Sequence, residues 1–406
     1  MPPVAASDRL VLSLCATEVL AMAGFGTFAA LLPTLQGEWS LSNAAAGWIE
    51  GAQQLGYLAS VPLLLGLSNR LDSRSTFLLS ALAGIIGSIG FSIFASGIWS
   101  ACLFRALSGA SLAGVLTTGL KILGDRMEGK TLTRSIAFYT ASFSLGGSVS
   151  VLLAGQAGAF GWRWSFAAAA LSGLIGLALG AATLPRSDDR RKDTSPWFLD
   201  LRPALANRPA MAYSLAYAGH MWELYGFRAW LVAFLVFSGA EGADATTVAA
   251  GILALALPAS VLGNELALRF GRRRTLYLMM GGSAALAGVI GFTAGLPFHA
   301  TAALCGLYAI TVSADSASLT AGAIAAAKPT SRGATIAIHS LIGFSGASLG
   351  PLAFGWTLDL AGADRGLGWG LAFAVLGLGV ATGPIALAIF AGRQKPTGTA
   401  ETRQKD

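Results

Sequence analysis

The chain has 406 residues, of which 54% are hydrophobic and only 12% are charged, and its mean hydropathy is +0.64. A soluble domain carries about 25% charged residues. This composition therefore nearly excludes a water-soluble globular enzyme, and the high apolar content excludes disorder. What remains is a polytopic helical membrane protein. In such a protein the net charge of +7 concerns membrane topology rather than a nucleic-acid partner.

Twelve apolar stretches follow one another along the chain. Each is long enough to cross a bilayer as a helix, because a crossing takes ~20 apolar residues and a spanning backbone must satisfy its hydrogen bonds internally. The first stretch is too long for the core of a signal peptide, so we interpret it as the first span. The predicted spans cover residues 10–33, 43–67, 76–97, 99–122, 134–159, 164–184, 209–238, 246–268, 275–296, 299–327, 333–358 and 369–391.

The charge of the loops predicts the orientation. When successive loops are assigned to alternate sides, 22 of the 27 Lys and Arg residues fall on one side, and only Arg163 and Arg365 fall on the other. Cytoplasmic loops carry the excess of basic residues in membrane proteins. We therefore expect a multi-pass protein of a bacterial inner (cytoplasmic) membrane with both termini in the cytoplasm.

The segment 185–208 is a long polar interruption of the apolar pattern, with mixed charges packed together at 188–193. We interpret it as a cytoplasmic linker between an N-terminal six-helix bundle (1–184) and a C-terminal six-helix bundle with a short basic tail (209–406). A docking or regulatory strip is the alternative reading of this segment.

The two bundles repeat each other about 200 residues apart. The loops 69–74 (NRLDSR) and 268–274 (LRFGRRR) both carry basic clusters, and 161–166 (GWRWSF) matches 368–373 (GWGLAF). Paired repeats of this kind form a transporter architecture, in which the binding site lies near the membrane midplane between the halves.

These loops, together with 104–109 (FRALSG) and 346–351 (GASLGP), resemble the motifs of the major facilitator superfamily, and the likeness covers essentially the whole chain. The resemblance implies an all-α protein of 12 transmembrane helices in two pseudo-symmetric six-helix halves, with spans one, four, seven and ten lining a central cavity. The chain departs from the family pattern at Asn69, Leu268 and Asp72. The residues to which the resemblance assigns gating are Arg70, Asp72, Arg74, Arg269, Gly271, Arg272, Gly350 and Pro351.

Ionisable side chains within a bilayer cost about 2.5–3.5 kcal/mol each on insertion scales, so each is a candidate functional residue. Six of them lie well inside the predicted spans, and five are on spans that line the cavity in the resembled fold. They are Glu18, Glu50, Arg105, Glu223, Arg228 and Asp315.

The seventh span holds the densest polar run, HMWELYGFRAW at 220–230. His220 and Glu223 share a helix face at a spacing of three, so they could exchange a hydrogen bond and pass on a proton, as a proton-coupling site requires. Alternatively, Glu223 pairs with an arginine. Trp222 and Tyr225 could stack on a substrate or anchor the helix at the membrane interface.

The remaining candidates also have two readings each. Glu18 is either a protonatable, cation-attracting group or a structural one. Arg105 matches a family arginine implicated in proton transfer, but it could also hold an anionic substrate or pair with Glu50. Asp315 either faces the cavity or packs against span eleven. Weaker candidates for the cavity rim are Gln53 and His339.

Together these features predict a secondary active transporter that moves a small organic solute by alternating access, coupled to protons through Glu18, Glu223 or Asp315. The arginines favour an organic anion, whereas the glutamates and aromatics favour a cation, as in multidrug export. The sequence contains no Walker loop, nucleophile elbow or metal-ligand cluster. We therefore expect a monomer that is not an enzyme and has no cofactor. The alternative from another class is a non-transporting sensor or scaffold on a transporter fold.

Overall fold

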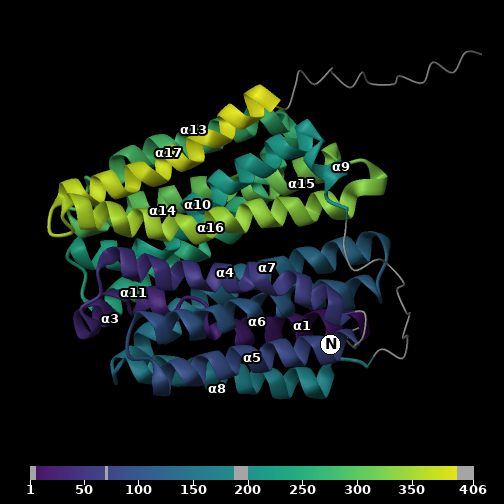
Figure 1. Ribbon diagram of the computed structural model, residues 1–406, viewed down its shortest axis with the longest axis horizontal. Helices are drawn as coiled ribbons and strands as arrows, with labels where there is room; N and C mark the ends of the chain where they lie inside the picture. The colour runs from purple at the N-terminus through teal and green to yellow at the C-terminus, as the bar shows by residue number, and fades with distance from the viewer. Residues whose placement is uncertain (1–5, 69–71, 187–199, 391–406) are drawn as a thin grey trace, which may run out of the picture.

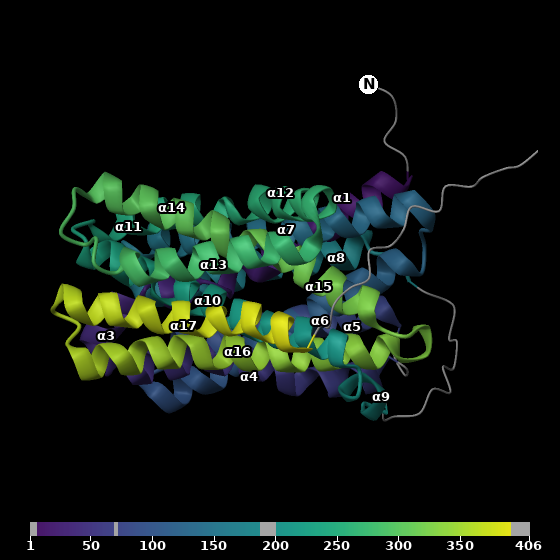
Figure 2. The same cartoon turned by 90° about the horizontal axis from the view of Figure 1, so that it is seen from above.

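The computed structural model describes residues 6–68, 72–186 and 200–390, and within these ranges the chain is helical and contains no strand. Long helices run roughly parallel through the bundle (Figures 1 and 2). In chain order they are α1 (Ala6–Ala21), η1 (Met22–Gly24), α2 (Thr27–Ala30), α3 (Leu32–Trp39), α4 (Asn43–Ser68), α5 (Ser73–Phe94), α6 (Ile98–Gly124), α7 (Gly129–Gly158), α8 (Trp162–Thr183), α9 (Arg202–Leu205), α10 (Arg208–Phe237), α11 (Gly242–Ala254), α12 (Ala256–Phe270), α13 (Arg272–Ile290), α14 (Phe298–Ala314), α15 (Ser316–Ala326), η2 (Pro329–Ser331), α16 (Arg332–Ala361) and α17 (Gly366–Phe390).

The helices form two groups. Helices α1–α8, the N-terminal group, gather in the lower part of Figure 1, and most of α9–α17, the C-terminal group, lie above them. The two groups meet where α4 packs against α16 and where α7 packs against α11. Residues far apart in the sequence therefore share the interface between the groups.

Each predicted apolar stretch coincides with one helix or with consecutive helices. In the described part of the chain, eight helical segments are long and apolar enough to cross a membrane. Large apolar side chains such as Trp99, Phe160 and Leu360 are exposed on the outside of the bundle. An exposed apolar surface of this kind is stable where lipid covers it.

Three of the predicted spans are broken, although the sequence suggested continuous helices. The first is interrupted after Ala21, the eighth at Leu255 and the tenth at Asp315. A broken helix inside a membrane requires partners for the backbone groups that the break releases. Arg105 and Ser150 supply them at the first break: the arginine donates to Gly24 O and Phe25 O at 3.1 Å, and the Ser150 hydroxyl donates to Ala23 O at 2.7 Å.

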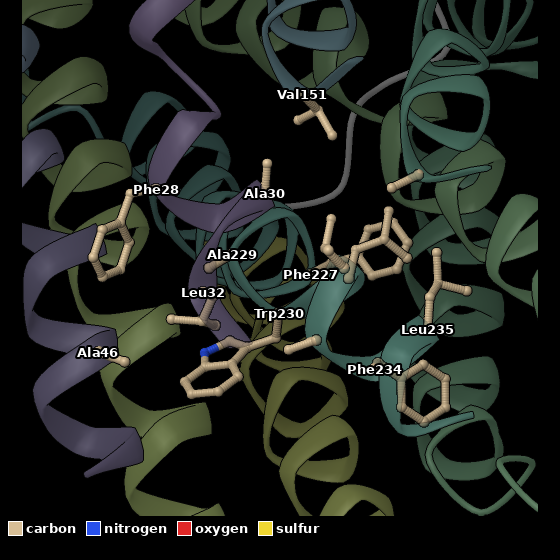
Figure 3. Packing of buried hydrophobic residues seen from close by; sticks show 14 of the residues in the cluster. Phe28, Ala30, Leu32, Ala46, Val151, Phe227, Ala229, Trp230, Phe234 and Leu235 are labelled. Atoms are coloured by element: carbon tan, nitrogen blue, oxygen red, sulfur yellow. The ribbon is translucent and has the colours of Figure 1, made fainter. Parts of the chain in front are cut away.

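A hydrophobic cluster joins the two groups (Figure 3). Phe28 and Leu32 from the N-terminal group pack in it with Trp230 and Phe234 from α10. The Trp230 indole is 1% exposed and donates to the Pro351 carbonyl oxygen at 3.0 Å. Trp230 is therefore a core residue that ties α10 to α16.

A candidate binding pocket between the two groups

A pocket lies at the interface and encloses about 470 Å³ of space between atoms, part of it open to the outside. Its walls come from both groups. They consist of Phe25, Gly26 and Ala29 at the broken first span, Glu50, Gln53 and Gln54 on α4, Ser144, Gly147, Ser148 and Val151 on α7, Tyr225, Arg228 and Ala229 on α10, and Leu253 on α11. The cavity itself is about 30 Å³, which is room for about two water molecules.

Contacts between the groups bound the pocket along α4 on both sides. Toward the end of the bundle where α1 begins (Figure 1), the Tyr57 ring of α4 stacks on the Phe344 ring of α16, with centroids 3.9 Å apart and planes at 12°. Toward the other end, the backbones of α4 and α16 touch at Gly47 and Pro351. A Cβ atom on Gly47 would lie 2.5 Å from the Pro351 carbonyl oxygen. The two groups are thus in contact above and below the pocket.

Beyond Gly47, a carboxylate of one group binds the N-terminus of a helix in the other. Asp359 near the end of α16 accepts hydrogen bonds from Asn43 N at 2.9 Å, from Asn43 Nδ2 at 2.8 Å and from Ala44 N at 2.8 Å. A negative charge is favourable there because the first N–H groups of a helix are unpaired and its dipole is positive. The sequence analysis missed Asp359. The available signal was Asn43 at the start of an apolar stretch, because Asn is typical of helix N-termini.

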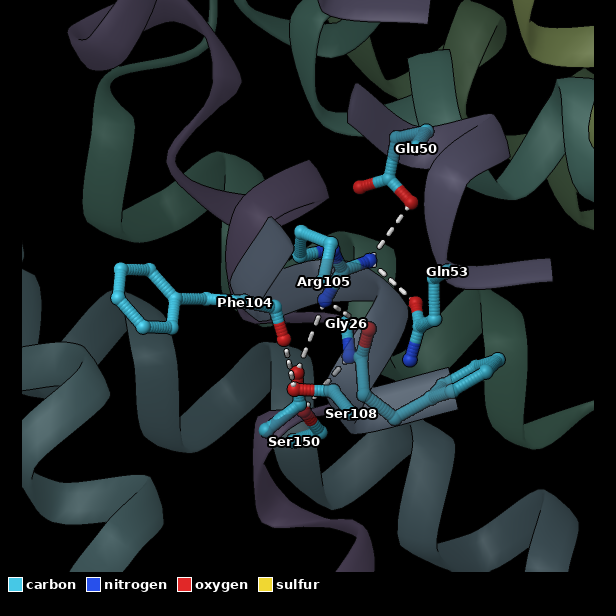
Figure 4. Close-up of polar contacts among 9 residues, drawn as sticks. Gly26, Glu50, Gln53, Phe104, Arg105, Ser108 and Ser150 are labelled. Atoms are coloured by element: carbon cyan, nitrogen blue, oxygen red, sulfur yellow. Dashed lines mark hydrogen bonds and ion pairs between the residues drawn. The ribbon is translucent and has the colours of Figure 1, made fainter. Parts of the chain in front are cut away.

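Arg105 is buried beside the pocket and holds three elements together (Figure 4). Its Nη2 lies 2.8 Å from Glu50 Oε2 and also donates to Gln53 Oε1, while Nη1 donates to the carbonyl oxygens of the broken first span. The sequence left several roles open for Arg105. In the structure it forms an ion pair with Glu50. The other carboxylate oxygen, Glu50 Oε1, has no hydrogen-bond partner among the described residues.

Arg228 is a cation that faces the pocket from α10. Its guanidinium carbon lies 5.7 Å from the centroid of the Tyr225 ring, within the range of a cation–π contact. Within residues 6–68, 72–186 and 200–390, no carboxylate oxygen is found within 4 Å of this guanidinium. The pocket therefore presents one positive charge without a counter-ion from the described chain.

His220 and Glu223 do not face each other in the structure. The Nδ1 atom of His220 lies 2.7 Å from Asp315 Oδ1, at the break between α14 and α15. Glu223 Oε1 instead accepts hydrogen bonds from the Ser283 hydroxyl at 2.6 Å and the Tyr308 hydroxyl at 2.9 Å. The two residues are three apart on one helix, but within the C-terminal group they contact different helices.

Glu18 occupies a comparable position in the N-terminal group. It is fully buried and accepts a hydrogen bond from the Ser142 hydroxyl of α7. Like Glu223, it lies outside the pocket lining, and its partners include the hydroxyls of Ser142 and Tyr139.

Two further candidates, Trp222 and His339, make contacts that hold helices together. The Trp222 indole donates to Val375 O at 3.2 Å and packs against α17, outside the pocket lining. The His339 ring stacks on Tyr217 with centroids 4.1 Å apart, and its nitrogens lie 3.3 Å from the hydroxyls of Ser214 and Thr320. Both side chains thus connect helices of the C-terminal group.

The expected gating residues divide by position. Arg70 lies outside the described residues, and Asp72 caps α5, accepting from Ser75 N at 3.0 Å and from the Ser75 hydroxyl at 2.6 Å. Partial burial opposes ionisation of Asp72, but these hydrogen bonds, with one from Arg74 and the charge of Arg74, outweigh it and hold the pKa of the carboxyl below its ordinary value.

The other gating candidates lie at helix ends or at the interface. Arg74 donates to the carbonyl oxygen of Ala181. Gly271 links α12 to α13 with φ +91°, a conformation that favours glycine, and it stands between Arg269 and Arg272. In α16, Gly350 packs against the backbone of Trp222, and Pro351 is its neighbour at the interface between the groups.

The fold is that of a multi-pass membrane protein with a pocket between two groups of helices. The family model for the Major Facilitator Superfamily matches residues 14–351. The chain therefore belongs to the major facilitator superfamily, as the sequence motifs predicted.

Individual relatives extend the likeness over most of the chain. It is 30% identical over 391 residues to the probable transporter SCO4007 of Streptomyces coelicolor, covering 90% of this chain and 88% of that protein. The match to the uncharacterized MFS-type transporter YceJ of Bacillus subtilis is 28% identical but spans only 41% of this chain and 43% of that protein. A crystal structure of a bacterial homolog to the human lysosomal transporter Spinster superposes with a TM-score of 0.74 at 19% identity, over 96% of both chains.

Proposed function

We propose that this protein is a secondary active transporter that binds a small organic solute in the pocket and exposes it to one side of the membrane at a time, coupled to protons. The composition of the pocket wall carries the proposal, because α4 and α7 of one group and α10 and α11 of the other all contribute side chains. Any movement of one group relative to the other must therefore change access to the pocket.

The proposed topology has twelve spans. An N-terminal bundle (1–184) and a C-terminal bundle (209–406) are joined by a cytoplasmic linker (185–208), in a monomer of a bacterial inner membrane with both termini in the cytoplasm. In this orientation the contact of Gly47 with Pro351 closes the pocket toward the outside, and the stack of Tyr57 on Phe344 closes it toward the cytoplasm. The conformation is then an occluded one.

Proton coupling is assigned to Glu18, Glu223 or Asp315. Glu18 and Glu223 are buried, and their hydrogen-bond partners in the described chain are hydroxyl groups rather than cations. Such a carboxyl can take up or release a proton without breaking an ion pair. Asp315 differs because the His220 ring beside it can receive a proton. Glu50 is poorly suited to this role because Arg105 holds it as a carboxylate partner.

The proposal is tested with purified protein in liposomes that contain a pH-sensitive dye. Panels of small carboxylates, amines and sugars are added outside in turn, and solute-induced proton movement is followed. We expect at least one class to drive proton movement, and we expect Glu223→Gln to abolish it while sparing exchange of labelled solute. Glu265→Gln, a change at an exposed carboxylate of α12, is the matched control.

One result would contradict the assignment to Glu223, and another would contradict transport itself. If Glu223→Gln leaves driven uptake unchanged, Glu223 is not the proton carrier. If a solute binds but no flux occurs under any imposed gradient, the protein is a sensor or scaffold on a transporter fold rather than a transporter.

A further inference from the structure

The charges that reach the pocket do not cancel. Glu50 and Arg228 both line it, but Glu50 is already paired with the buried Arg105 at 2.8 Å. Arg228 has no carboxylate within 4 Å in the described part of the chain. Because a half-buried charge without a counter-ion is costly, the pocket favours a ligand that brings a negative charge.

The shape of the charged group narrows the class of anion. A guanidinium presents a planar fork of donors that matches the two oxygens of a carboxylate. Its carbon lies 5.7 Å from the Tyr225 ring, and both side chains line the pocket. A single arginine suits one carboxylate, whereas a phosphate dianion generally gathers several cationic or N–H donors.

A second feature of the pocket requires a hydrogen-bond donor on the ligand. Gln54 is 1% exposed, lines the pocket, and its Oε1 has no partner among the described residues. Glu50 Oε1 is unpaired in the same way. Buried acceptors without a donor are destabilising, so a hydroxyl or N–H group of a bound ligand would supply the missing hydrogen bonds.

We propose that the solute is a small organic carboxylate that also carries a hydroxyl or N–H group, with its carboxylate on Arg228 and its donor on Gln54 and Glu50. This assignment rests on the transport function proposed above and names the substrate class of the same pocket. An amine or a quaternary cation does not fit, because Arg228 would repel it and Arg105 already neutralises Glu50.

The test measures binding to the purified full-length protein by thermal shift. The probes are 4-hydroxybenzoate and lactate, their uncharged amides 4-hydroxybenzamide and lactamide, benzoate without the hydroxyl group, 4-hydroxybenzylamine as the cation, and glycerol phosphate. We expect a hydroxycarboxylate to raise Tm with concentration, and its amide to bind about tenfold or more weakly, as expected for a lost hydrogen bond to a charged group.

Variants of the protein test which residue binds the carboxylate of the ligand and which binds its hydroxyl group. Arg228→Gln should weaken carboxylate binding about tenfold or more, and Arg228→Lys should weaken it less because the charge remains. Gln54→Met should weaken the hydroxycarboxylate but not the carboxylate without a hydroxyl group. Arg163→Gln is the matched control, since that guanidinium lies over the Trp162 ring at 4.4 Å but outside the pocket.

The proposal is overturned if no carboxylate of the panel binds, if the amine or glycerol phosphate binds in its place, or if Arg228→Gln binds the carboxylate like the wild type. Its failure is distinguishable from failure of the transport function. Proton movement driven by an amine refutes the substrate class and keeps the transporter, whereas carboxylate binding without flux refutes the transporter and keeps the substrate class.

Discussion

The link between Asp359 and the first turn of α4 gives the sharpest prediction about the movement of the two groups. Its carboxylate accepts three hydrogen bonds from Asn43 and Ala44 of the other group. These bonds exist only while the groups touch at this end. Asp359→Ala therefore removes an interaction that belongs to the closed arrangement and is absent when this end opens.

The magnitude follows from the contacts. A side chain that caps a helix N-terminus contributes about 0.5–2 kcal/mol, and a charge near the helix dipole adds about 0.3–1 kcal/mol. Asp359 is exposed, so solvent and salt screen both contributions, and a total of about 1 kcal/mol is reasonable. A free energy of that size changes the ratio of open to closed molecules roughly fivefold.

The assay is the distance between two spin labels, one at Glu38 before α4 and one at Leu367 at the start of α17, both exposed positions in different groups. Asp359→Ala should move population toward longer distances. Asp364→Asn is the matched control, because this exposed aspartate lies 3.9 Å from Arg365 of its own group. An unchanged distribution with Asp359→Ala, or an equal shift with Asp364→Asn, would refute the reasoning.

Three further predictions concern stability and closure. Arg105→Met should cost about 3–5 kcal/mol of stability, because it leaves Glu50 without its buried partner. In melting experiments, Glu50→Gln combined with Arg105→Gln should recover part of that loss. Equal Tm values for all variants would contradict this. Gly47→Ala should lengthen the same label distance, because its Cβ would lie 2.5 Å from Pro351 O, whereas Gly251→Ala, with nothing within 4 Å, should not. Asp72→Ala should lower stability by about 1 kcal/mol at neutral pH. Because the pKa of Asp72 is lowered, the wild-type advantage should be present above the ordinary pKa of 3.8 and vanish as pH falls below it, so a pH-independent difference in Tm would count against the cap.

The positions of the helices could be predicted because they depend on local composition. The stretch predicted at 76–97 is α5 (Ser73–Phe94), and the one predicted at 99–122 is α6 (Ile98–Gly124). The twelve-span topology and the division at 185–208 remain predictions.

The breaks and the pairings could not be predicted because their partners are distant in the sequence. The first span breaks where Arg105 and Ser150 satisfy its backbone, 81 and 127 residues away. The i, i+3 spacing of His220 and Glu223 suggested a pair, but tertiary packing gives His220 to Asp315. The pairing of the arginines could not be predicted either, because only the folded arrangement shows that Arg105 meets Glu50 while Arg228 meets no carboxylate of the described chain.

The central claim, that the pocket is open to each side of the membrane in turn, has a direct test that requires no known solute. Ser144 lines the pocket, so Ser144→Cys in a chain whose own Cys15, Cys102 and Cys305 are replaced gives one reactive thiol. Its labelling by a membrane-impermeant maleimide is measured from each face of oriented vesicles, alone and with Asp359→Ala. We predict labelling from both faces without an ion leak, and faster labelling from the Asn43 end with Asp359→Ala. Labelling from one face under all conditions, or from both with a continuous ion leak, would contradict alternating access.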